Sequence, residues 1–183
     1  MSSSDVLASM LHSCSLLDLE EDISGKKKVR LVEKQCTDSK IEILHLPSDT
    51  FVLDLDKAFN TERLFHGKSG ECKRADYLLI SESAERVLFI EMKRSNSQAN
   101  DIALQLRGAL CAFEYCQIIA REFFQEPAFL KNYQKRFIAI LHTTGRKSQT
   151  AVSRSIESSS HCTPDDFLRI SGRQTIQFRQ LAN

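Results

Sequence analysis

A short apolar segment, residues 74–93, constrains the fold of this chain more than any other stretch. It holds two apolar runs separated by a polar turn at 81–85, a pattern that predicts an antiparallel hairpin. An acid stands where each run meets polar sequence. Asp76 precedes the first run, Glu91 lies near the end of the second, and Lys93 follows two residues later. A turn at this place predicts that Asp76 lies directly opposite Glu91.

The predicted pairing gathers these three side chains on one face of the hairpin. Directly opposed residues on neighbouring strands point the same way, with Cβ atoms about 4.5–5.5 Å apart. Residues two apart on one strand also share a face, so Lys93 joins Asp76 and Glu91. Two opposed carboxylates repel each other unless a cation lies between them, and Mg²⁺ is typically held by one or two carboxylates with waters and phosphate. The pattern therefore predicts a site for Mg²⁺ or Mn²⁺.

The spacing Asp76-x14-Glu91-x-Lys93 on two adjacent strands resembles the PD-(D/E)xK nuclease superfamily, which has the restriction-endonuclease-like fold. Ala75 stands where that family often has proline. The resemblance covers about residues 40–145. It implies an α/β fold with an αβββαβ core, in which a mixed central β-sheet is flanked by helices.

The resemblance also implies roles for individual residues. Asp76 and Glu91 would bind the metal ion, the backbone carbonyl of Met92 would add a ligand, and Lys93 would be the catalytic lysine. The implied activity is metal-dependent hydrolysis of phosphodiester bonds, with DNA rather than RNA as the expected substrate. A role in anti-phage defence is inferred only from functions that are common in this family.

Accessory residues are less well determined by the spacing. Many members of the family carry a further acid on the first helix, and Glu20, Glu21 or Glu33 could serve here. Some branches place a glutamine early in the helix that follows the lysine, where this chain has Gln105. The tyrosine that those branches show four residues later is replaced by Ala109.

Hydrophobic periodicity predicts the remaining elements. Its clearest signal is a long helix over 98–124, which is apolar on a wide face. Helical spacing also favours a helix over 4–20 and, more weakly, over 56–64. The expected strands cover 29–36, 40–46, 50–55 and 137–142, and the pair 167–170 and 175–178 is expected to form a hairpin that turns at 171–173.

The length of 183 residues suits one domain. We expect a single PD-(D/E)xK nuclease-like domain over 1–183, with its core at about 40–145. The serine-rich and basic residues 144–163 predict an exposed loop, and 164–183 predict an extra C-terminal hairpin.

The net charge of +1 neither requires nor excludes a nucleic-acid partner, so only a local basic surface can argue for one. Lysine and arginine side chains supply most of the sequence-independent affinity for phosphate backbones. The candidates for such contacts are Lys68, Lys73, Arg74, Arg94, Arg146 and Lys147. Cutting both strands of a duplex would favour a homodimer or a larger complex.

The six cysteines form no Cys-x-x-Cys pair, which favours free thiols over a zinc site or a disulfide framework. No apolar run reaches the length of a membrane span, and the first residues do not resemble a signal peptide. We therefore expect a cytoplasmic protein without a membrane partner.

In a second interpretation the chain has the same fold but no catalytic activity, because fold does not imply function. On this interpretation the chain is a catalytically inactive PD-(D/E)xK subunit that binds nucleic acid or assembles into a defence or repair complex. The absence of a separate motor or specificity domain in these 183 residues is compatible with it. A thiol-based or zinc protein is a third interpretation.

Overall fold

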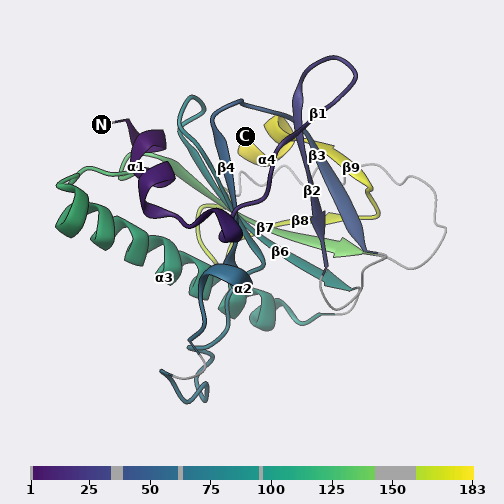
Figure 1. Ribbon diagram of the computed structural model, residues 1–183. Helices are drawn as coiled ribbons and strands as arrows, with labels where there is room; N and C mark the ends of the chain where they lie inside the picture. Colours follow the sequence, from purple (N-terminus) through teal and green to yellow (C-terminus); the bar gives the residue numbers. More distant parts are fainter. Residues whose placement is uncertain (1, 34–38, 62–63, 95–96, 143–159) are drawn as a thin grey trace.

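The computed structural model describes residues 2–33, 39–61, 64–94, 97–142 and 160–183. The chain is a mixed α/β protein with two mixed β-sheets (Figure 1). Its helices are α1 (Ser3–Met10), the 3₁₀ turn η1 (Ser13–Ser15), α2 (Leu55–Ala58), α3 (Ala99–Phe124) and α4 (Phe178–Ala182). Its strands are β1 (Glu20–Glu21), β2 (Lys27–Val32), β3 (Lys40–Leu46), β4 (Thr50–Asp54), β5 (Tyr77–Ser81), β6 (Arg86–Arg94), β7 (Gln134–His142), β8 (Leu168–Ser171) and β9 (Thr175–Gln177).

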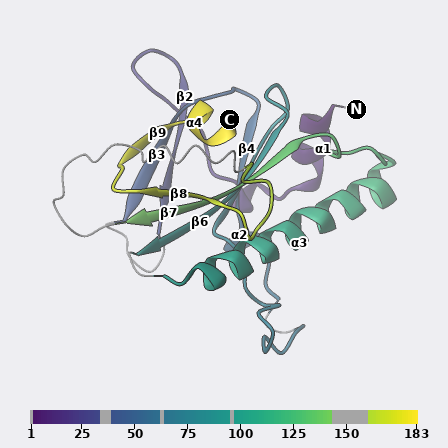
Figure 2. The same ribbon diagram turned by 180° about the vertical axis from the view of Figure 1, so that it is seen from behind.

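The larger sheet has the strand order β4-β5-β6-β7-β8. Strands β4, β5 and β6 form an antiparallel meander, and β7 and β8 then add in parallel. A parallel neighbour needs a crossover connection, and α3 supplies it between β6 and β7. The helix runs along one face of this sheet, as Figures 1 and 2 show from opposite sides.

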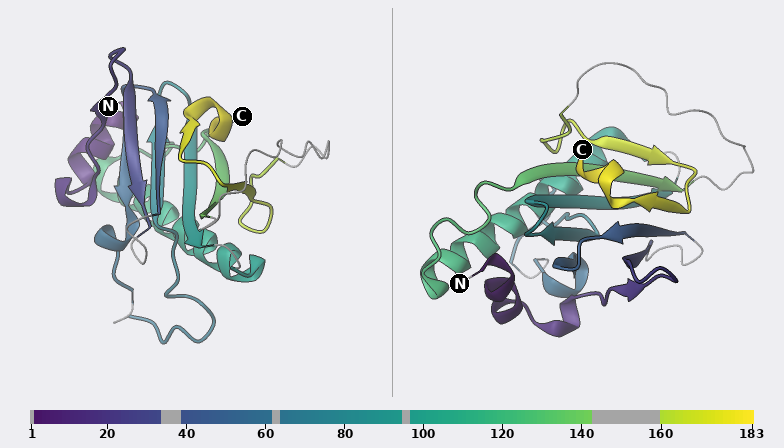
Figure 3. Two further views of the ribbon diagram at one scale, coloured as in Figure 1. Left: turned by 90° about the vertical axis from the view of Figure 1, so that its right-hand side faces the viewer. Right: turned by 90° about the horizontal axis from the view of Figure 1, so that it is seen from above.

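The smaller sheet has the order β1-β2-β3-β9 and covers the other face (Figure 3). We predicted a mixed central sheet flanked by helices, and the mixed α/β class agrees with this prediction, but on this face a second sheet lies beside α4. The reason is the alternation of apolar residues along β2 and β3, which gives each strand one buried side. This layer carries the apolar positions Val29, Leu31, Ile41 and Ile43, all of them buried.

Two separate apolar cores follow from this arrangement. One lies between the larger sheet and the helices α1 and α3, where Phe89 stacks on Phe137 with ring centroids 4.5 Å apart and meets Phe113 edge-on. The other lies between the two sheets and is closed by α4. Successive residues of β5 and β6 alternate between the two cores, so both faces of the hairpin are buried as predicted.

The N-terminal helix is shorter than predicted. It begins with a capping box in which the Ser2 side chain accepts from the N–H of Asp5, and it ends at Met10 instead of continuing to residue 20. The apolar residues beyond it are used differently. Leu17 donates a backbone hydrogen bond to the carbonyl of Val52 at 2.8 Å, so this segment pairs with β4 in an extended form. The helix predicted over 56–64 is likewise reduced to the single turn α2.

The predicted C-terminal hairpin does not form. The chain turns near Gly172, which has a φ of 67°, but β8 and β9 do not pair with each other. β8 pairs with β7 in the larger sheet, and β9 pairs with β3 in the smaller sheet. Both pairings are parallel, and each strand forms the edge of its sheet. The tail thus extends both sheets, and α4 follows it.

The loop predicted over 144–163 lies mostly outside the described residues, as does the tip of the hairpin between β2 and β3. Within the described part of the chain, no helix combines the length and the apolar character needed to cross a membrane.

Candidate active site

The register of the central hairpin is the predicted one. Tyr77 pairs with Ile90 and Leu78 with Phe89, and the ladder runs without a bulge to Ser81. One further step places Asp76 opposite Glu91, at the end of β5 where the ladder stops. The Asp76 carboxylate is fixed there, because its Oδ2 accepts a 2.7 Å hydrogen bond from the backbone N–H of Met92.

Glu91 is the most deeply buried acid of this group, at 1 % exposure. The Lys93 ammonium lies 2.9 Å from Glu91 Oε1, and the Lys93 side chain is 18 % exposed. Apart from this ion pair, neither carboxylate oxygen of Glu91 has a hydrogen-bond donor among the described residues. A buried carboxylate without donors is energetically unfavourable unless a cation or a proton accompanies it.

Burial and neighbouring negative charges raise the pKa values of both acids. Desolvation raises the pKa of Asp76 to about 6, helped by the negative charges of Glu33 and Asp56 and opposed by the Met92 N–H and by Lys93. Desolvation also raises the pKa of Glu91 to about 9, with Asp76 as the next contribution and Lys93 opposing. The site thus favours an added positive charge, whether a proton or a metal ion.

The lysine keeps its proton in this setting. Burial by itself lowers the pKa of Lys93, but the interaction with Glu91 and the charges of Asp76 and Glu33 outweigh burial, so that the net shift is upward. Lys93 is therefore an ammonium ion at neutral pH, and it sits where negative charge is concentrated.

Glu33 supplies the third acid near this site. It is 4 % exposed, and its charge contributes to the raised pKa values of both Asp76 and Glu91. It follows β2, whose last residue, Val32, is held to β5 by hydrogen bonds with the Tyr77 hydroxyl. The signal for it is present in the sequence, because Val29, Leu31 and Glu33 alternate and the buried face of this strand thus ends in an acid.

Glu20 and Glu21, the other candidates for a third acid, lie elsewhere. Both are exposed on β1 and form ion pairs with Lys28 and Lys27, at 3.3 Å and 2.8 Å respectively. Neither contributes to the shifted pKa values of Asp76 and Glu91. The acidic end expected of the first helix is absent because that helix stops at Met10.

Helix α3 presents Gln105 toward the segment that leads into Asp76. One turn before Gln105, Asp101 is ion-paired with Lys73, and one turn after it, Gly108 lies against the backbone of Lys73. Residues at this spacing share a helix face. The Gln105 side-chain oxygen is buried and has no hydrogen-bond donor in the part of the chain that the structure describes.

The predicted phosphate contacts are only partly available. Lys68 is exposed, whereas Lys73 is ion-paired with Asp101 and Arg74 lies 3.3 Å from Asp56. The side chains of Arg94, Arg146 and Lys147 lie outside the described residues.

A hard divalent cation fits this donor set. Apart from the ion pair with Lys93, the oxygens of Glu91 have no donor in the described part of the chain. Asp76 has one oxygen that does not take the Met92 N–H, and Mg²⁺ prefers oxygen ligands at about 2.0–2.1 Å. The fit is to one or two carboxylates completed by waters and phosphate. Among the described residues no group of three or more His, Cys, Asp or Glu side chains is arranged to hold a metal ion by itself.

Comparison with protein-family models, with curated proteins and with solved structures found no match for this chain.

Proposed function

We propose that this chain is a metal-dependent nuclease of the PD-(D/E)xK type that hydrolyses phosphodiester bonds, with DNA as its substrate. The observation that carries the proposal is the juxtaposition of Asp76, Glu91 and Lys93 across one hairpin, with Glu91 buried and ion-paired with Lys93. Such an arrangement is unfavourable for stability alone, and buried acids with raised pKa values are typical of functional sites.

The order of elements supports the same family. When the elements of the smaller sheet, η1 and the single turn α2 are set aside, helix α1, the meander β4-β5-β6, the crossover helix α3 and the parallel strand β7 occur in the order α, β, β, β, α, β. This is the core order that the resemblance implies. The second sheet and α4 lie outside that core, so they are additions to it on this interpretation.

Asp76 and Glu91 are the residues that would hold Mg²⁺ or Mn²⁺, with the Met92 carbonyl as a further ligand. When bound, the metal ion would polarise the phosphate and lower the pKa of a bound water. Asp76 is oriented for this role by the Met92 N–H, which fixes one of its oxygens and leaves the other available. Glu33 adds negative charge beside the pair.

Lys93 has the electrostatic role in this proposal. Its raised pKa keeps it protonated, so it is suited to stabilise the negative charge that develops on the phosphate oxygens and to orient the attacking water. It is less suited to remove a proton from that water, since a general base must be deprotonated at the working pH.

The test is cleavage of supercoiled plasmid, linear duplex and single strands in Mg²⁺, Mn²⁺ or EDTA, with the variant Lys93→Ala. Loss of a preorganised charge that stabilises the transition state lowers kcat by about 10²–10³-fold. The control is Lys131→Ala, which removes an exposed lysine beyond the far end of α3. Equal cleavage by the wild type and Lys93→Ala in the presence of metal would reject the mechanism.

The alternative, a catalytically inactive subunit of a defence or repair complex, has one observation in its favour. Glu91 is 1 % exposed, and an inactive member of the fold can keep such an acid as a buried ion pair with Lys93. This alternative expects no heat when Mn²⁺ is titrated into the protein. Binding that disappears in Asp76→Ala would argue against it.

We also propose the binding partners and the cellular location of the chain. The chain is expected to act in the cytoplasm, to bind DNA in preference to RNA, and to pair as a homodimer or within a larger complex when both strands are cut. Sedimentation with and without a duplex tests the last of these expectations.

A further inference from the structure

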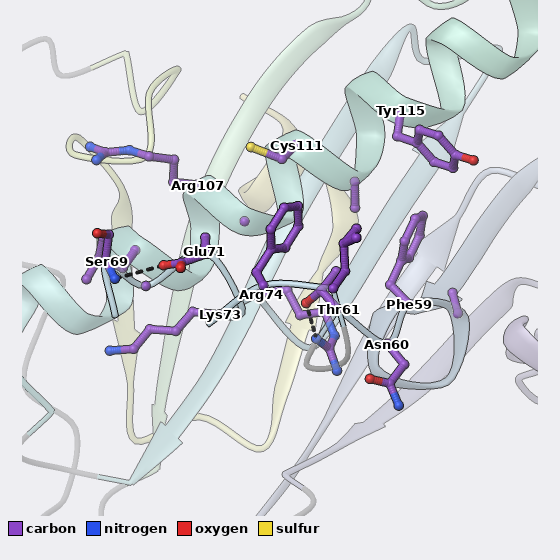
Figure 4. A pocket seen from close by; sticks show the side chains of 17 residues that line it. Phe59, Asn60, Thr61, Ser69, Glu71, Lys73, Arg74, Arg107, Cys111 and Tyr115 are labelled. Carbon is purple, nitrogen blue, oxygen red and sulfur yellow. Dashed lines mark hydrogen bonds between the residues drawn. The ribbon is translucent and has the colours of Figure 1, made fainter. Parts of the chain in front are cut away.

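A cavity of about 760 Å³ lies between α3 and the connection from α2 to β5. Figure 4 shows Phe59 and Tyr115 at one end and Ser69, Glu71 and Lys73 at the other. This volume falls in the range of about 300–1,000 Å³ that is typical of small-ligand sites.

The wall formed by α3 is mostly apolar. It consists of side chains spaced three or four residues apart on one helix face, namely Leu104, Gly108, Cys111, Ala112 and Tyr115. The opposite wall contributes Phe59, Leu64 and Phe65. Phe59 and Tyr115 meet edge-on with ring centroids 6.3 Å apart. The cavity therefore offers aromatic surface around an open slot.

The charged groups of the lining are engaged with other residues. Lys73 is ion-paired with Asp101, and Arg107 binds both carboxylate oxygens of Asp165 at 2.9 Å. In Figure 4 the charged ends of Lys73 and Arg107 extend away from the aromatic end of the cavity.

The two remaining charged groups are engaged as well. Arg74 lies 3.3 Å from Asp56 and donates to Thr61, and the Glu71 carboxylate accepts from the backbone N–H groups of Gly67 and Ser69. The described lining thus suits an uncharged, ring-shaped group better than a phosphate or a carboxylate.

The cavity adjoins the proposed active site along the chain. Arg74, which lines the cavity, is two residues from Asp76. Its partner Asp56 follows Leu55, whose backbone N–H donates to the Asp76 carbonyl at 3.0 Å. A group seated in the cavity and attached to a phosphate would therefore hold that phosphate on the side of the acids. A nucleobase has this combination, with an uncharged aromatic ring linked to a charged backbone.

We propose that this cavity binds one unpaired nucleobase of the substrate, stacked against Tyr115, Phe59 and Phe65, beside the nuclease centre. The proposal rests on the proposed function and narrows it to substrates with single-stranded or flipped nucleotides. Stacking on aromatic side chains tolerates any base, because every base has a π-face. A flipped base is commonly held between such side chains in a closely fitting pocket.

The test measures binding in EDTA, so that no cleavage is required. The probe is a fluorescently labelled single-stranded oligonucleotide of mixed sequence, followed by anisotropy, and a fully paired blunt duplex of the same sequence serves as comparison. Tyr115→Ala is expected to weaken single-strand binding by about tenfold, the effect of one stacked base. Tyr115 is 54 % exposed, so its removal is compatible with folding.

Two further variants, one that fills the cavity and one that serves as a control, make the test more specific. Cys111→Trp fills the cavity instead of emptying it and is expected to weaken single-strand binding as well. Phe123→Ala is the matched control, since Phe123 is an aromatic residue of α3 that is 74 % exposed and does not line the cavity. It is expected to bind as the wild type does. Duplex binding is expected to be the same for all four proteins.

The outcomes separate this proposal from the nuclease itself. Single-strand binding that is unchanged in both Tyr115→Ala and Cys111→Trp overturns the base pocket, even when the wild type cleaves DNA. Tyr115-dependent binding of an apolar dye, together with no Tyr115-dependent binding of the oligonucleotide, overturns it in favour of a different ligand. Tyr115-dependent binding of single strands by a protein that cleaves nothing in Mg²⁺ or Mn²⁺ supports the pocket and rejects the nuclease.

Discussion

The Tyr77 hydroxyl donates a hydrogen bond to the carbonyl of Val32 at 2.8 Å and accepts one from the N–H of the same residue at 3.3 Å. Tyr77 belongs to the larger sheet and Val32 to the smaller one. The two bonds therefore join the sheets at a single point, directly beside Asp76 on one strand and Glu33 on the other. This link brings the third acid of the candidate site into position.

We expect Tyr77→Phe to lower the free energy of unfolding by about 1–2 kcal/mol, because it leaves the backbone groups of Val32 without their partner while the ring stays in place. Urea unfolding measures the change. Tyr115→Phe is the control, since that ring is exposed and its loss of a hydroxyl should leave the urea midpoint unchanged. Equal midpoints for Tyr77→Phe and the wild type would show that the bonds do not hold the sheets together.

Gly108→Ala should destabilise the protein, although alanine normally stabilises a helix by about 1 kcal/mol relative to glycine. A Cβ atom at this position would lie 1.7 Å from the carbonyl oxygen of Lys73, so α3 would have to move away from the connection that leads to Asp76 and β5. We expect a loss of more than about 3 kcal/mol, as for other severe core clashes.

Gly25→Ala is the comparison for this prediction, because no atom lies within 4 Å of its added Cβ. Its φ of 75° predicts a loss of only about 1–2 kcal/mol. Thermal unfolding followed by circular dichroism measures both variants. A Gly108→Ala protein that is as stable as the wild type would contradict the close packing of α3.

Without metal, the protein should lose stability as the pH rises from about 4.5 to 9. Folding raises the pKa of Glu91 from 4.5 to about 9 and that of Asp76 from 3.8 to about 6. Between the lower and the higher value of each acid, the folded state therefore binds more protons than the unfolded state. The stabilisation that these two groups supply is fully present at a pH below the pKa values of the unfolded state. It is lost as the pH rises through the pKa values of the folded state. One such group contributes a slope of at most about 1.4 kcal/mol per pH unit.

Glu91→Gln should flatten this dependence and stabilise the metal-free protein at pH 8, because an amide needs no proton to remain neutral. Urea midpoints in EDTA from pH 5 to pH 9 measure the effect. If the midpoint of the wild type rises over this interval, Glu91 is not held in its protonated form.

Mn²⁺ should stabilise the folded protein through Asp76 and Glu91. A ligand that binds only the folded state adds about 2.7 kcal/mol to the free energy of unfolding when its concentration is 100 times its Kd. In a protein of this size, each kcal/mol raises Tm by about 2–4 °C. Asp76→Asn is expected to abolish the shift. Glu20→Gln is the control, since it alters an exposed acid on β1 and should leave the shift intact. A shift that persists in Asp76→Asn would place the ion elsewhere.

The central hairpin and α3 could be predicted because their signals are local. Two apolar runs with one polar turn between them determine the register, and a wide apolar stripe marks α3. The same local rules explain the placement of Asp76 opposite Glu91. These elements depend on contacts between neighbouring segments, which a pattern in one window can represent.

The second sheet and the tail could not be predicted in the same way. β9 has three residues and pairs with β3, which lies more than a hundred positions earlier in the chain. No local pattern separates that partner from the nearer strand β8, so a hairpin was expected instead. Glu33 could have been singled out from the alternation along β2, but its approach to Asp76 depends on how one sheet packs on the other.

The short segment that carries β8 and β9 has a consequence for biosynthesis. A ribosome makes this segment after β1 to β7, yet each sheet depends on it to cover an edge. Until it emerges, β3 and β7 present unpaired backbone groups that can recruit strands from other nascent chains. Translation that stalls shortly before residue 168 should therefore yield chains that need chaperone protection, even though all of the proposed catalytic residues have already been synthesised.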